Sequence, residues 1–104
     1  MRMIMKKIKI NGLEWKVYLV DQNHPKLADK NAYGITYFRE CEIYIDSELP
    51  APLLKQIVIH ELVHAIAFSY GVVLVGAAEE GFCDFVAAHF DEIKTLRKAI
   101  LKAL

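Results

Sequence analysis

Residues 57–66 (IVIHELVHAI) place two histidines and a glutamate in an otherwise apolar run. On a helix, residues four apart share a face, so His60 and His64 are expected to present their imidazoles side by side. Two nitrogen ligands at this spacing can bind one zinc ion. Glu61 is expected to project beside them, where it can act as the general base for a zinc-activated water. The segment therefore predicts a zinc site on a helix.

The residues around these three side chains are all uncharged, which is typical of a buried helix. Hydrogen-bonded core histidines are the alternative interpretation. However, two histidines and a glutamate buried without a metal would leave several polar groups to satisfy, at about 1–3 kcal/mol each. The burial cost favours the metal.

A catalytic zinc takes a third protein ligand and keeps one open position. The downstream candidates are Glu79, Glu80, Cys83, Asp84 and His89. His64 lies about 9 Å from the end of its helix, so a second helix packed antiparallel to it reaches that level within its first turn. Glu79 and Glu80 fall in this turn, whereas His89 lies about 13 Å further along.

Glu80 and Asp84 are four residues apart and share a face, so one can bind metal while the other orients a ligand histidine. We predict Glu80 as the third ligand and Asp84 as the orienting residue. Alternatively, Glu79 and Glu80 are first-turn acids that the helix dipole favours, and Asp84 is a solvated charge. Cys83 is interpreted as a small buried hydrophobe.

The elements that must position these residues follow from the apolar patterns. Alternation on both sides of Asn11-Gly12 predicts a hairpin, residues 21–31 read as a loop, and residues 32–46 predict two more strands that turn near Arg39-Glu40. We expect an α+β fold: a small antiparallel sheet of three to four strands packed on the metal helix and a second, C-terminal helix.

Two helices are predicted in the second half of the chain. Residues 53–70 are apolar on all sides, which indicates a buried helix. Apolar residues recur at intervals of three and four over residues 77–104, and we expect Phe82, Phe85 and Phe90 to pack in the core. No linker divides the chain, so a single domain over residues 1–104 is expected.

Composition limits the class of protein. The net charge is zero, which gives no sign of a nucleic-acid partner. No apolar run approaches the roughly 18 residues of a membrane span, and the two cysteines form no CxxC pair. We expect a cytoplasmic protein without nucleic-acid or membrane partners, as a monomer or small oligomer.

HELVH followed by EEGFCDFVA resembles the gluzincin metallopeptidases, and in particular the small ImmA/IrrE family of phages and mobile elements. His60, Glu61 and His64 match the first motif, and Glu80 and Asp84 match the second. The resemblance covers residues 43–88. It implies a minimal zincin-like fold with Zn²⁺ bound by His60, His64 and Glu80.

The resemblance also implies an activity: a zinc metallopeptidase that hydrolyses peptide bonds with Glu61 as general base. Its substrate would be a protein or peptide, with a repressor or host protein as the expected class. The strand within residues 40–46 is expected to form the rim of the cleft. The candidate oxyanion donors are Tyr33, Tyr37, Tyr44 and Tyr70.

Two alternatives stay open. The chain could be a non-catalytic, zinc-stabilised protein-binding module of phage or mobile-element origin, in which the metal serves folding. The same chemistry could also hydrolyse a non-peptide carbonyl compound.

Overall fold

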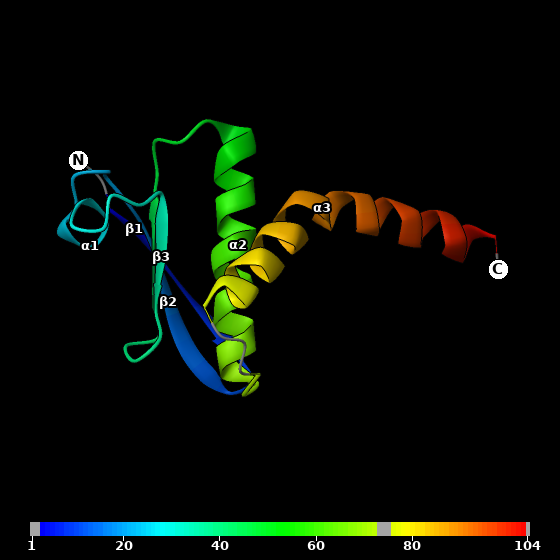
Figure 1. Ribbon diagram of the computed structural model, residues 1–104, viewed down its shortest axis with the longest axis horizontal. Helices are drawn as coiled ribbons and strands as arrows, with labels where there is room; N and C mark the ends of the chain where they lie inside the picture. Colours follow the sequence, from blue (N-terminus) through cyan, green and yellow to red (C-terminus); the bar gives the residue numbers. More distant parts are fainter. Residues whose placement is uncertain (1–2, 73–75, 104) are drawn as a thin grey trace.

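The computed structural model describes residues 3–72 and 76–103 and contains a four-stranded sheet and two long helices (Figure 1). The elements in chain order are β1 (Ile4–Ile10), β2 (Leu13–Val20), α1 (Pro25–Ala28), β3 (Gly34–Tyr37), β4 (Glu42–Asp46), α2 (Ala51–Ser69) and α3 (Ala77–Lys102). The predicted α+β class is confirmed. The predicted last residue of the second helix, Leu104, lies outside the described residues.

The hairpin between β1 and β2 turns at the predicted place. Asn11 and Gly12 have φ angles of 50° and 81°, and a two-residue hairpin turn of this kind requires positive φ at both positions. The Asn11 side-chain amide also donates to the carbonyl of Ser69, at 2.9 Å. The turn is therefore fixed both by its own residues and by the end of α2.

The sheet has the strand order β1-β2-β4-β3, and the β2–β4 pair is parallel. The prediction of an antiparallel sheet is thus wrong for this pair, and the sheet is mixed. Residues 21–33 stay at one end of the sheet, so that β3 begins with Gly34 paired to Ile45. The chain then turns back, and β4 fills the position between β3 and β2. The connection also contains α1, where only a loop was expected.

The core lies between the sheet and α2. Trp15, Ile43 and Ile45 of the sheet form a fully buried cluster with Ala65 of α2. The Trp15 indole N–H donates to the Ser69 hydroxyl at 2.8 Å, which satisfies the one polar group of that ring. By length and composition α2 could cross a membrane, a test that core helices of soluble proteins also pass.

Helix α3 crosses α2 with its first turns, and the rest of it extends away from the sheet and α2 (Figure 1). Cys83 in the crossing region is fully buried. Phe82, Phe85 and Phe90 are 49%, 60% and 38% exposed, so the prediction that they pack in the core is wrong. Phe82 lines the groove between α2 and α3 but stays half exposed, and Phe85 and Phe90 do not line that groove.

The close approach of β3 to α2 depends on Gly34. A Cβ there would lie 2.8 Å from Ile57 Cγ2 and 3.1 Å from Glu61 Cγ, whereas a Cβ at Gly81 would meet nothing within 4 Å. Ile57 is branched at Cβ and has little freedom to move away.

We expect Gly34→Ala to lower the free energy of unfolding by about 1–3 kcal/mol, the usual cost of overpacking. Gly81→Ala should raise it by about 1 kcal/mol, because alanine is the better helix former. Urea unfolding followed by circular dichroism measures both. Equal stability of the two variants would contradict the close approach of β3 to α2.

Candidate metal site

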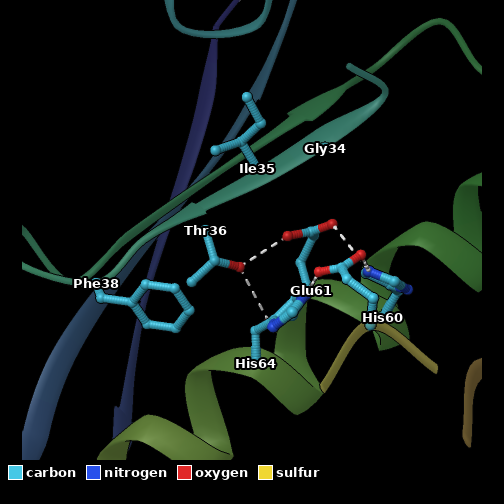
Figure 2. A pocket seen from close by; sticks show the side chains of 8 residues that line it. Gly34, Ile35, Thr36, Phe38, His60, Glu61 and His64 are labelled. Carbon is cyan, nitrogen blue, oxygen red and sulfur yellow. Dashed lines mark hydrogen bonds and ion pairs between the residues drawn. The ribbon is translucent and has the colours of Figure 1, made fainter. Parts of the chain in front are cut away.

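His60 and His64 lie one turn apart on α2, with ring centroids separated by 5.0 Å. His64 is 7% exposed, and the side chain of His60 is 13% exposed. Figure 2 shows both rings beside Glu61, below the strand that carries Thr36. The helical spacing predicted from the sequence thus brings both imidazoles to one face, largely shielded from solvent.

Each imidazole has an acidic partner from α3 at its Nδ1 atom. Asp84 Oδ1 lies 2.9 Å from His60 Nδ1, and Glu79 Oε2 lies 2.6 Å from His64 Nδ1. A carboxylate at this position favours the proton on Nδ1 and leaves the Nε2 lone pair free to bind a metal. Asp84 thus contacts one of the two histidines, and its role as the orienting residue stays a prediction. The contact between Glu79 and His64 was missed, although the second ring also needs a partner.

Glu80 lies between the two free ring nitrogens. Its Oε2 is 3.3 Å from His60 Nε2, and its Oε1 is 2.7 Å from His64 Nε2. Lone pairs of two imidazoles and a carboxylate that converge in this way need a positive charge among them, either a proton or a cation. Two nitrogens and a carboxylate oxygen are ligands that zinc accepts. The donor set therefore fits the predicted ion, and the assignment of Glu80 as a ligand stays a prediction.

Cys83 also belongs to this cluster. Its Sγ and one ring nitrogen each of His60 and His64 lie within 4.8 Å of one another, so these three residues can hold a metal ion. The sequence analysis treated Cys83 as a buried hydrophobe, and it is indeed fully buried. Its place three residues after Glu80, on the same face of a helix, was the signal that could have identified it.

The surroundings of Cys83 oppose a free thiolate. Burial, followed by the charges of Glu79 and Glu80, raises the pKa of the Cys83 thiol to about 12. A metal ion must therefore displace a proton before the sulfur can bind. His89, by contrast, is exposed and pairs with Glu92 at 3.1 Å, in keeping with its predicted distance from the site.

Glu61 is 5% exposed and is held by β3. The Thr36 hydroxyl donates to Glu61 Oε1 at 2.7 Å, and Glu61 Oε2 lies 3.9 Å from His60 Nε2 (Figure 2). Burial raises the pKa of the Glu61 carboxyl, and the Thr36 hydrogen bond and the two histidines partly offset this effect. Thr36 was missed because the sequence carries no signal for the register of β3 against α2.

These groups open onto a cavity of about 250 Å³. It is lined by Gly34, Ile35, Thr36, Phe38, His60, Glu61, His64 and Glu80. β3 is an edge strand of the sheet, while β4 is paired on both sides. The expectation that residues 40–46 form the rim of the cleft is therefore wrong, because β3 takes that place.

The four tyrosines considered as oxyanion donors do not line this cavity. Tyr37 donates its hydroxyl to the Lys26 carbonyl at 2.7 Å. Tyr44 stacks on Tyr18, with ring centroids 4.7 Å apart. Tyr70 lines a separate apolar groove between α2 and α3, and Tyr33 is exposed. The expected donor is therefore not among them in this structure.

No protein-family model, curated protein or solved structure matches this chain. The geometry gives a possible metal site at His60, His64 and Cys83.

Proposed function

We propose that the protein is a zinc-dependent metallopeptidase of the gluzincin type, similar to the ImmA/IrrE proteins. His60, His64 and Glu80 would bind the zinc, and Glu61 would be the general base. One observation carries the proposal: two Nε2 atoms and the Glu80 carboxylate converge beside a buried glutamate, on a cavity open to the surface.

Zinc, when bound, would polarise the substrate carbonyl and lower the pKa of a water. Glu61 would take the proton of the attacking water and return it to the leaving amine. Its place beside the ring nitrogen of His60, 3.9 Å from Oε2, suits both transfers, because a general base must lie within reach of the metal-bound water. Thr36 occupies Oε1, which leaves Oε2 to exchange the proton.

An extended peptide is the substrate shape that suits the site. The free edge of β3 borders the cavity, and its backbone groups can pair with a peptide strand. Side chains of the peptide would then alternate toward and away from the zinc ligands. A protein with an exposed extended segment, such as a phage or host repressor, is the substrate class we propose, met in the cytoplasm.

Cys83 supports a second candidate function, a zinc-stabilised binding module without catalysis. A structural zinc has four protein ligands, while a catalytic zinc keeps one position open. If Cys83 and Glu80 both bind with the two histidines, the site is closed. If Glu80 binds and Cys83 stays protonated, one position is open for substrate.

Zinc content separates these arrangements. We expect one zinc per chain in tag-free protein, and a loss of zinc affinity of at least about tenfold in Glu80→Ala. Cys83→Ser should keep its zinc if the site is catalytic and lose affinity if the site is closed. Elemental analysis and competition with a chelator measure this.

The control for these variants is Glu92→Ala, which removes an exposed acid from the same helix. Absence of zinc in the wild-type protein, even after zinc is added back, would remove the metal site altogether.

Glu61→Gln tests catalysis. We expect this variant to keep its zinc and to lose peptide hydrolysis by about 10²–10⁴-fold, the usual contribution of a general base. Mass spectrometry of a mixture of unstructured peptides would show new amino termini with the wild-type protein only. A zinc-loaded wild-type protein that leaves all peptides intact, as Glu61→Gln does, would favour the binding module.

Thr36 should act as a positioning residue for Glu61. Thr36→Val removes the hydroxyl but keeps the shape, and we expect kcat to fall about 10–100-fold, the worth of a hydrogen bond to a charged group. KM and zinc content should stay unchanged. Thr36→Ser restores the hydroxyl and should recover most of the rate. Equal rates for the valine and serine variants would show that the hydrogen bond has no catalytic effect.

A further inference from the structure

An apolar stripe runs along α3; its first members, Phe82 and Val86, line the groove between α2 and α3, and its later members lie beyond that groove. Its members are spaced alternately four and three residues apart: Phe82, Val86, His89, Ile93, Leu96 and Ile100. Ile93, Leu96 and Ile100 are 52%, 55% and 64% exposed. By helical geometry the centre of the stripe lies about 100° around the axis of α3 from the buried Cys83, and none of its members belongs to the metal site. The stripe is thus separate from the metal site.

This spacing is a heptad repeat, the pattern of a two-stranded coiled coil. Val86, Ile93 and Ile100 occupy the first heptad position, called a, and Leu96 occupies the fourth, called d. Branched residues at a with leucine at d favour parallel pairs of helices. His89 is the one polar residue of the stripe, and a polar residue in such a seam fixes the register.

The residues that flank the stripe indicate the partner. In a parallel pair, the residue just before an a position, at sequence position i, faces the residue at position i+5 of the other helix. Phe85 then faces Phe90 of the second copy, and Glu92 faces Arg97 of the second copy. An antiparallel pair would not bring Glu92 to Arg97 in this way. Both flanking pairs are therefore complementary when the partner is the same helix.

Glu92 and Arg97 do not form an ion pair with each other within one chain. Glu92 and Arg97 are five residues apart, and residues that interact along a helix are three or four apart. Within residues 3–72 and 76–103, Arg97 takes part in no ion pair, and Glu92 pairs with His89 alone. Arg97 is therefore available to a second molecule.

We propose that α3 forms a parallel homodimer through this stripe. The occupant of the exposed face is a second copy of the chain, in register, with a seam from His89 to Ile100. Each metal site lies on the α2 side of its own α3, so both sites stay accessible. The proposal is independent of the proposed hydrolase activity, since it uses none of the site residues.

Leu96→Glu and Lys98→Glu form a matched pair of tests. Leu96 lies in the seam, and Lys98, on the same turn, lies on the outer side of the helix. We expect a dimer for the wild-type protein and for Lys98→Glu in sedimentation velocity, and a monomer for Leu96→Glu. Zinc content should be the same in all three proteins, while the helical circular dichroism of Leu96→Glu should fall by at most the free part of α3 that loses its partner. A monomeric wild-type protein at the highest soluble concentration would overturn the proposal and assign the stripe to a different protein or a membrane surface.

Disulfide trapping tests the direction of the helices. In a parallel pair Leu96 meets Leu96 of the second copy, so Leu96→Cys should form a covalent dimer on mild oxidation. Lys98→Cys is the control: it has the same native cysteines, and it should not form a covalent dimer. A dimer that persists in sedimentation but is not trapped by Leu96→Cys would overturn the parallel arrangement.

Discussion

The contact between α2 and the first turns of α3 is the interaction on which the site depends. It brings three acids, Glu79, Glu80 and Asp84, against the two histidines of α2. Buried ionisable groups destabilise a fold unless they are paired, so the two histidines and the mostly buried Glu79 require this contact, whereas the side chains of Glu80 and Asp84 stay largely exposed. The acids that hold α3 in place are therefore also the groups that orient the rings.

The chemistry of the centre depends on which third donor the ion prefers. Glu80 has a 58% exposed side chain and approaches from the solvent side, while Cys83 is fully buried and approaches from the interior. Burial, followed by the charges of the nearby acids, raises the pKa of the Cys83 thiol, which weakens it as a ligand relative to a carboxylate. Zinc prefers thiolate once the proton is lost, so these two effects oppose each other. Their balance decides between an open and a closed site.

The features that were predicted from the sequence are those set by neighbouring residues. Asn11-Gly12 encodes its own turn, and the spacing of His60 and His64 encodes a shared helix face. The features that were missed depend on non-local packing. Alternation in β4 is the same whether its neighbour is parallel or antiparallel, and nothing near Thr36 indicates that β3 approaches Glu61. Cys83 was one of the candidate ligands but was interpreted as a buried hydrophobe, because apolar neighbours describe a core cysteine and a metal-bound cysteine equally well.

Helix α3 shows a further limit of periodicity, because an apolar stripe indicates burial but does not name the partner. Phe82, Phe85 and Phe90 were expected in the core of the same chain, yet α3 has 26 residues and only its first turns pack on α2. A helical segment without tertiary contacts is marginal in water below about 12–15 residues, since helices in proteins are stabilised mostly by packing of an apolar face. The free part of α3 is of about that length, and α2 does not cover it because α3 extends away from α2 beyond their crossing (Figure 1). A second copy of the same helix supplies the missing face and matches its charges.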